Sequence, residues 1–293
     1  MPDVCLWHRC NSDCIMCTNM DAFLRTPDRC YDTPAQLRKL RHLEERAASG
    51  APEDGYVLFT GGEPTLHPEF FVLLERYRQA FPTAPFCLLT NGRRVSRREC
   101  AERLLRLGGR PLTIGIPFHG PNSRAHDAIT RAPGSFLQTL KGLRNILSLR
   151  GPGQAVEIRL LLHRMTARGI GATLEFILGV LPANGPDRVC LVHFEVEGQA
   201  EKNFSALKLS LTECVASLLP HLPLLRRFPE FRLYHFPLCV LPPSLQPYAW
   251  KTLPQKDIRF LRKCRPCLRR KDCLGLPRWY PERFGDGEIR PIA

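Results

Sequence analysis

The chain has 293 residues, of which 44% are hydrophobic and 24% charged, so it can bury a large core and is neither a disordered tail nor a fibrous repeat. Its longest uncharged apolar runs, such as residues 176–183, fall well short of the roughly 20 residues that a bilayer span needs. The 42 basic and 28 acidic residues leave a net charge of +14, which favours acidic partners without choosing among nucleic acid, phosphorylated molecules and acidic peptides.

The first 196 residues alternate short β-rich runs with helical patterns, as parallel strands joined by crossover helices do. Six strands are predicted, at 4–7, 56–60, 86–90, 112–117, 156–162 and 189–194. Helices are predicted near 35–48, 68–80, 95–107, 135–149 and 170–181. Polar or glycine-rich turns follow several of the strands, which is where barrels keep their active sites. We therefore predict an α/β fold, a partial (β/α)6 TIM-like barrel.

The pattern changes beyond residue 205. One helix is predicted near 208–220 and an extended segment at 231–237, followed by a cysteine- and arginine-rich tail with little apolar periodicity. A segment of this composition is too small to bury a core of its own and is typical of a module held together by metal. We expect a barrel at 1–205 and a metal-binding extension at 206–293.

The cysteine content also points to metal. Charged residues interrupt the first fifteen positions, so no signal peptide is predicted and a cytoplasmic location is expected. In that reducing compartment, thirteen cysteines indicate metal binding more than a disulfide framework. Two basic runs, at 38–41 and 93–98, have the pattern of solvated helix faces, so the charge alone does not indicate nucleic-acid binding.

Three cysteines follow the first predicted strand in a C-x3-C-x2-C spacing: Cys10, Cys14 and Cys17. Iron–sulfur cubes are normally held by four thiolates, so three would leave one iron open. An open position distinguishes a catalytic metal site from a closed structural one, and a chelating small molecule could fill it. The alternative is a zinc site completed by a distant fourth ligand.

The second predicted strand ends in Gly61, Gly62 and Glu63, followed by a proline. Two glycines let the backbone approach a ligand closely, and the carboxylate can accept a hydrogen bond from an ammonium group. Alone, these residues could form an ordinary strand-ending turn. Adjacent parallel strands would bring this turn and the cysteine loop to the same barrel mouth, so the two motifs together are far more specific than either.

Together these residues resemble the radical S-adenosylmethionine (radical SAM) superfamily. The resemblance implies a [4Fe–4S] cluster, held by the three cysteines, that binds SAM at its open iron and cleaves it to methionine and a 5′-deoxyadenosyl radical, which abstracts a hydrogen atom from a substrate. It implies an electron donor of the flavodoxin or ferredoxin type and a SAM amino group bound by residues 61–63. Met16 would lie beside the adenine, where the family commonly has an aromatic residue.

Further polar residues near the strand ends are weaker candidates. Contacts to the SAM ribose or carboxylate could come from Thr90, Asn91, His119 and Arg159, although each could equally be a structural residue at the barrel mouth. No residue is assigned as proton donor or acceptor. His193, Glu195 and Glu197, near the end of the sixth strand, are the places to look.

The tail carries a second set, Cys239, Cys264, Cys267 and Cys273, in the spacing C-x24-C-x2-C-x5-C. Four cysteines can close a tetrahedral zinc site or hold an iron–sulfur cluster, and spacing does not fully separate the two. Beside a radical SAM barrel, the tail resembles the auxiliary-cluster modules called SPASM and twitch, which share the C-x2-C-x5-C run. That resemblance implies a second, auxiliary [4Fe–4S] cluster.

The stretches 126–130, 134–143, 156–159 and 238–241 resemble radical SAM peptide maturases, most of all those of the His-Xaa-Ser repeat peptide system. This implies modification of a C–H bond in a ribosomally made precursor peptide. Many such maturases carry an N-terminal recognition domain, whereas here the first predicted strand begins at once. We therefore expect a separate recognition protein, or a small substrate.

Alternatives stay open. A radical SAM enzyme could act on a small molecule such as a nucleoside or sugar, or transfer the 3-amino-3-carboxypropyl group of SAM. In a different class, the chain would be a non-catalytic metal protein with a basic nucleic-acid-binding surface. That hypothesis leaves the glycine turn at 61–64 unexplained.

Overall fold

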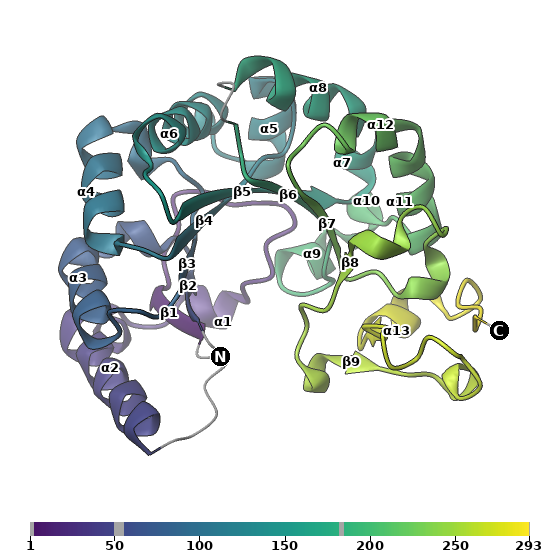
Figure 1. Cartoon of the computed structure of the whole chain (residues 1–293), viewed down its shortest axis with the longest axis horizontal. Coiled ribbons are helices and arrows are strands. Elements are labelled where there is room, and N and C mark those ends of the chain that lie inside the picture. Colours follow the sequence, from purple (N-terminus) through teal and green to yellow (C-terminus); the bar gives the residue numbers. More distant parts are fainter. Residues whose placement is uncertain (1–2, 50–55, 182–184, 293) are drawn as a thin grey trace.

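The computed structural model describes residues 3–49, 56–181 and 185–292. Its centre is an eight-stranded sheet in which the strands follow one another in chain order and all neighbours are parallel. The strands are β1 (Asp3–Trp7), β2 (Val57–Gly61), β3 (Phe86–Leu89), β4 (Leu112–Pro117), β5 (Gln154–Leu162), β6 (Arg188–His193), β7 (Phe231–Tyr234) and β8 (Ala249–Trp250). Figure 1 shows the sheet curving into an open arc, so the barrel is partial.

Helices join the strands and cover the outer side of the arc (Figure 1). The longer ones are α2 (Thr33–Ala48), α3 (Phe70–Ala80), α4 (Arg98–Gly108), α5 (Ser123–Thr130), α6 (Ser135–Leu149), α8 (Ile170–Val180) and α11 (Leu211–Leu218). Six are short: α1 (Asp21–Leu24), α7 (Arg164–Ala167), α9 (Gln199–Lys202), α10 (Phe204–Leu207), α12 (Leu222–Leu225) and α13 (Tyr280–Phe284). Over the described ranges, no helix is both long and apolar enough to cross a membrane.

Side chains along each strand alternate between the two faces of the sheet. In β5, Ile158 and Leu160 belong to the main core, which the outer helices cover. On the opposite, concave face, Cys190, Val192 and Tyr234 form a separate small apolar cluster. This face therefore combines apolar patches with charged side chains, while the main core lies between sheet and helices.

The partial barrel predicted from the sequence is confirmed, and all six predicted strands are present within two residues of their expected ends. The sheet has two strands more than predicted. β7 lies in the extended segment expected at 231–237, and β8 has only two residues, too few for any alternation to reveal. Both lie beyond residue 205 and continue the barrel sheet, whereas the boundary between the two expected domains stays a prediction.

Of the longer helices, the sequence analysis missed α5. It starts at an Asn122 side chain that accepts from the Ala125 N–H at 3.0 Å. Its eight residues are too few for a clear helical period, and only His126, Ile129 and Thr130 are buried. The helix matters for function because its last turn holds the cysteine loop.

Four buried histidines near the carboxyl ends of the central strands make the fold acid-sensitive: His126, His163, His193 and His235. Burial lowers the pKa of each to about 4. In the unfolded chain their pKa is about 6.5, so between these values the unfolded state binds more protons. The stability that these neutral histidines contribute should be fully present above that pH range, and it should be lost as the pH drops through the range.

We expect the melting temperature to fall steadily between pH 6.5 and 4. His126→Phe removes one titrating group, and its new ring would pack beside Phe118 and Phe136. Between these pH values the free energy of unfolding should then change with pH less steeply, by about 1.4 kcal/mol per pH unit. His42→Gln, on the exposed side of α2, is the control that leaves the slope unchanged. Thermal melts by circular dichroism measure this, and an unchanged slope in His126→Phe would contradict it.

Candidate functional site

The three N-terminal cysteines lie in the loop between β1 and α1, which runs along the inner side of the arc (Figure 1). Backbone bonds fasten this loop to the end of α5: the Asp13 N–H donates to the Thr130 oxygen at 2.9 Å, and the Ile15 N–H to the Ile129 oxygen at 2.9 Å. A further bond, from the Cys17 N–H to the Cys14 oxygen at 3.0 Å, closes a tight turn between two of the cysteines. The loop is thus held by its backbone, which leaves the thiols available.

The three thiols share one site. Burial raises the pKa of Cys10 to about 11, with smaller contributions from Glu63 and Cys17. Burial also raises the pKa of Cys14, and the neighbouring Cys17 and Cys10 raise it further. Such thiols become thiolates only when a positive charge compensates them, as bound metal does.

Hydrogen-bond donors surround this site, which suits a metal–sulfur cluster. The Ser12 N–H donates to Cys10 Sγ at 3.4 Å, and Asn91 Nδ2 lies 3.9 Å from the same sulfur. Over the described ranges, no three Cys, His, Asp or Glu side chains converge as closely as the ligands of a single metal ion do. The ligands of an iron–sulfur cube bind different corners and stand further apart, so the donor set fits a cluster.

The glycines of the second motif are required by a close backbone contact. A Cβ on Gly61, at φ 138°, would lie 2.2 Å from the Trp7 oxygen, and one on Gly62 would lie 2.5 Å from the oxygens of His8 and Arg9. The Gly62 N–H donates to Trp7 at 2.7 Å. The two glycines therefore let the end of β2 pack directly on the chain that leads into Cys10.

Glu63 is buried and accepts four hydrogen bonds. Oε1 receives the Thr65 N–H at 3.1 Å, the Thr65 hydroxyl at 2.6 Å and the Thr90 hydroxyl at 2.6 Å, and Oε2 receives the Asn91 N–H at 2.7 Å. Burial raises the pKa of this carboxyl, and the hydrogen bonds oppose the rise. Its acceptor sites are thus used to join the ends of β2 and β3, including the predicted residues Thr90 and Asn91.

The basic run 93–98 was predicted to be a solvated helix face, and for its first two residues this is wrong. Arg93 Nη1 bonds the Asn11 backbone oxygen and, at 3.1 Å, the Ser12 hydroxyl. Arg94 Nη1 bonds the Thr65 oxygen. These arginines hold the cysteine loop and the glycine turn, and no local pattern distinguishes them from their exposed neighbours.

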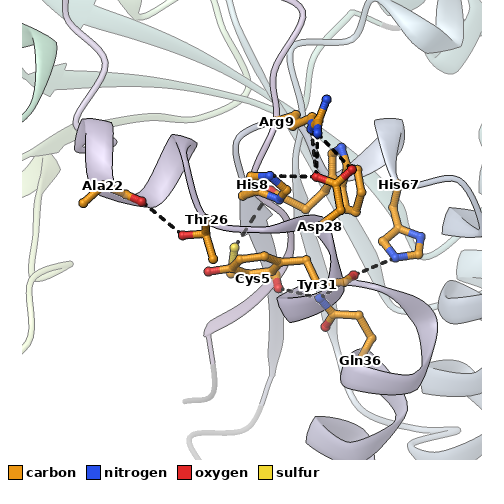
Figure 2. A network of polar contacts seen from close by, with 10 residues as sticks. Cys5, His8, Arg9, Ala22, Thr26, Asp28, Tyr31, Gln36 and His67 are labelled. Carbon is orange, nitrogen blue, oxygen red and sulfur yellow. Dashed lines mark hydrogen bonds and ion pairs between the residues drawn. The ribbon is translucent and has the colours of Figure 1, made fainter.

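A polar network braces the two stems of the cysteine loop (Figure 2). Arg9 forms two bonds of 2.9 Å to the Asp28 carboxylate, and His8 Nε2 lies 3.1 Å from the same group. The fully buried Gln36 donates to the Leu6 oxygen at 2.8 Å. The chain before Cys10 is thereby tied to the segment that follows the loop.

Of the remaining predicted contacts, Met16 belongs to the cysteine loop itself, whereas His119 follows β4 and Arg159 lies on β5. Met16 is buried in the main core. His119 is buried beside His126, with ring centroids 5.2 Å apart. Arg159 lies on the concave face, with its guanidinium carbon 5.5 Å from the centre of the Tyr234 ring. Asn91 bonds the cysteine loop directly, at Cys10 and Asn11, whereas Thr90 bonds Glu63.

The four C-terminal cysteines line one small cavity, together with apolar side chains such as Leu276 and Ile289. Backbone N–H groups point at two of the sulfurs: those of Leu238 and Gly275 lie 3.3 and 3.4 Å from Cys273 Sγ, and that of Ile292 lies 3.4 Å from Cys267 Sγ. A cavity between four thiols, with N–H donors around it, has the donor set that holds an iron–sulfur cluster.

The short helix α9 lies between the two cysteine sites. The Gln199 N–H, at its start, donates to the Cys17 oxygen at 2.8 Å. Glu201, two residues on, pairs with Arg283 of α13 in the C-terminal region. A continuous chain of contacts therefore joins the first cysteine loop to the C-terminal extension.

Comparison with known proteins identifies the family. The profile of the radical SAM superfamily matches residues 4–177, more than half of the chain. The chain belongs to the radical SAM superfamily. Membership implies a [4Fe–4S] cluster and SAM, and it supports an enzymatic role.

Among curated proteins, the pre-heme d1 synthase of Dinoroseobacter shibae is 28% identical over 203 residues, 68% of this chain and 45% of that protein. The subtilosin biosynthesis protein AlbA of Bacillus subtilis is 27% identical over 150 residues, 47% of this chain and 28% of that protein. The chain therefore spans less than half of the length of either relative.

Among solved structures, Streptococcus suis SuiB bound to its precursor peptide SuiA has a TM-score of 0.58 at 14% identity, covering 78% of this chain and 47% of that one. The enzyme anSMEcpe, with bound SAM and a peptide, has a TM-score of 0.54 at 15% identity, covering 78% of this chain and 61% of that one. These similarities establish a shared fold.

The close contact at Gly62 gives a direct test of the site. We expect Gly62→Ala to cost about 3 kcal/mol and to reduce iron uptake during anaerobic reconstitution, because its Cβ would push the His8–Arg9 backbone aside. Gly179→Ala in α8, where nothing lies within 4 Å, is the matched control and should stabilise the helix by about 0.5–1 kcal/mol. Melting temperature and bound iron measure both effects, and full iron loading of Gly62→Ala would contradict this account.

Proposed function

We propose that the protein is a radical SAM enzyme that modifies a C–H bond in a ribosomally synthesised peptide, as a peptide maturase. The observation that carries the proposal is the pair of cysteine sites: three thiols on the inner loop of the barrel, and four thiols around one cavity in the extension. The first set leaves one cluster position for SAM, and the second has enough ligands for a closed auxiliary cluster.

Cys10, Cys14 and Cys17 would hold the SAM-binding [4Fe–4S] cluster. When bound, cluster and SAM supply the 5′-deoxyadenosyl radical that abstracts hydrogen from the substrate. Because the Glu63 carboxylate already accepts four bonds, the SAM ammonium group would meet the backbone oxygens of the glycine turn instead. Glu63 then orients that turn.

The other predicted SAM contacts differ in support. Thr90 and Asn91 hold the rim of the site beside Glu63, which suits contacts to the ribose or carboxylate. Arg159 offers a guanidinium on the concave face, where it could bind a carboxylate. Met16 and His119 are both buried, so in our proposal they act through packing. Met16 would pack near the adenine, and His119 would support the end of β4.

Cys239, Cys264, Cys267 and Cys273 would hold the auxiliary [4Fe–4S] cluster. Four thiolates around one cavity are enough to ligate a cubane cluster, and the resemblance to auxiliary-cluster modules favours iron over zinc. Arg269 and Arg270, which also line the cavity, offset part of the thiolate charge. In this position the cluster would accept an electron from the substrate radical or position the substrate.

A peptide substrate is supported by the names of two similar proteins. The solved structure of SuiB contains a bound precursor peptide, and AlbA is named as a bacteriocin biosynthesis protein. By analogy we propose a precursor peptide presented by a separate recognition protein, and a flavodoxin- or ferredoxin-type electron donor.

A second candidate, action on a small molecule, is favoured by one observation. The relative matched over the larger part of this chain is named a pre-heme d1 synthase. Arg188 and Arg232 pair with Glu157 and Glu230, so Arg159, at 3.6 Å from Glu157, is the cation that would bind an acidic group of such a substrate.

Cys14→Ala tests the ligand assignment. After anaerobic reconstitution with iron and sulfide, the wild type should convert SAM to 5′-deoxyadenosine in the presence of dithionite, and Cys14→Ala should not, because two thiolates cannot hold the cluster. Cys30→Ser, which changes an exposed thiol outside both sites, is the control. Turnover in Cys14→Ala would disprove the assignment.

The SAM fragment distinguishes the reaction classes. 5′-Deoxyadenosine supports hydrogen abstraction, and methylthioadenosine would indicate transfer of the aminocarboxypropyl group. Neither fragment, together with bound zinc, would favour a non-catalytic metal protein.

The double variant Cys264→Ala/Cys267→Ala tests the auxiliary site, because the two thiolates left in the tail cannot hold a cluster. We expect it to lower bound iron from about eight to about four atoms per chain and to stop product formation, while part of the SAM cleavage remains. Iron analysis and chromatography of the SAM fragments measure this. Unchanged iron content would remove the auxiliary cluster from the proposal.

A further inference from the structure

Two titratable side chains meet on the concave face, beyond the ends of neighbouring strands. Glu195 follows β6 by two residues, and His235 follows β7 directly. His235 Nε2 lies 3.5 Å from Glu195 Oε1, and His235 Nδ1 lies 2.9 Å from the His193 backbone oxygen. Neither group belongs to the cysteine sites or to the residues around them described above.

The second contact determines where one proton of the imidazole sits. A backbone carbonyl can only accept, so Nδ1 must carry the hydrogen that it donates to His193. In a neutral ring Nε2 is then a bare lone pair, and it faces a carboxylate oxygen. Two acceptors face each other stably only when a proton lies between them.

The backbone is strained to keep this arrangement. His235 has φ 72°, one of two non-glycine residues with positive φ in the described ranges. This conformation is unfavourable for an L-residue and persists where the surroundings enforce it. Here it turns a ring that is 8% exposed towards Glu195, whose side chain is 27% exposed and so remains accessible.

We propose that Glu195 and His235 hold one proton between them and form an acid–base pair on the concave face of the sheet. This inference rests on the proposed function for the substrate that would use it.

The pair is built to take a further proton. A substrate X–H bond would break and its electron pair would stay on the substrate. The proton would form an O–H bond with the free oxygen of Glu195 while the shared proton passes to His235 Nε2, which leaves a carboxylic acid beside an imidazolium; no electron moves in this step. The groups that face the pair are Arg159 on β5, Glu197 in the same loop, and Asp257. Burial raises the pKa of Glu195 and lowers that of His235 to about 4, so it disfavours the charged form of both groups.

Infrared difference spectroscopy of the whole protein at pH 7 tests the shared proton. The wild type minus Glu195→Gln should show a protonated carboxyl band that shifts in D2O, or a doubly protonated imidazole band if the proton rests on the ring. Glu175→Gln, an exposed change in α8, should show neither. An ionised carboxylate beside a singly protonated ring would overturn the proposal.

A second variant keeps the test independent of how Glu195→Gln folds. Asparagine tolerates positive φ, so His235→Asn preserves the backbone while removing the ring nitrogen. Its amide donates to the carboxylate, so the band of the shared proton should disappear at pH 7. A protonated carboxyl that persists unchanged would mean that burial alone holds the proton, and sharing would be disproved.

The role in catalysis is measured with the small-peptide fraction of the source organism's extract, SAM and dithionite. The ratio of mass-shifted peptide to 5′-deoxyadenosine should fall about 100-fold in Glu195→Gln and stay unchanged in Glu175→Gln. Wild-type product formation by Glu195→Gln would disprove the role. If the wild type modifies no peptide, the peptide maturase proposal fails, whereas the infrared result still decides the shared proton.

Discussion

The contact between the ends of β1 and β2 is the constraint on which the barrel mouth depends. Gly61 and Gly62 pack against the backbone of residues 7–9 at distances that no Cβ could occupy. A hydrogen bond of 2.8 Å from the Glu63 N–H to the Arg9 oxygen completes the contact. The cysteine loop begins one residue later, so its position follows from this packing.

Glu63 extends the contact to the next strand. Its carboxylate gathers donors from its own turn and from Thr90 and Asn91 after β3. Asn91 Nδ2 in turn donates to the Asn11 side chain at 2.7 Å, and Arg93 bonds the same loop. Three successive strand ends thus support one cysteine loop, which gives a rigid frame for a cluster whose open position must stay accessible.

Sequence patterns predicted the parts of the protein that depend on local order. The strands and longer helices have clear periods, and the cysteine spacings fall at strand ends or in a tail without its own core. The roles of Arg93 and His235 could not be predicted in this way. One is an arginine within a basic run, and the other acts through a backbone carbonyl 42 residues away in sequence, so only the folded chain brings their partners together.

The central claim is that three thiolates hold a cluster with one position open to SAM. Electron paramagnetic resonance of the dithionite-reduced double variant Cys264→Ala/Cys267→Ala tests it most directly, because the two thiols left in the tail cannot hold a cubane cluster. The account predicts a [4Fe–4S] signal whose g-values change when SAM is added. A signal that SAM leaves unchanged would show a closed site and contradict the account.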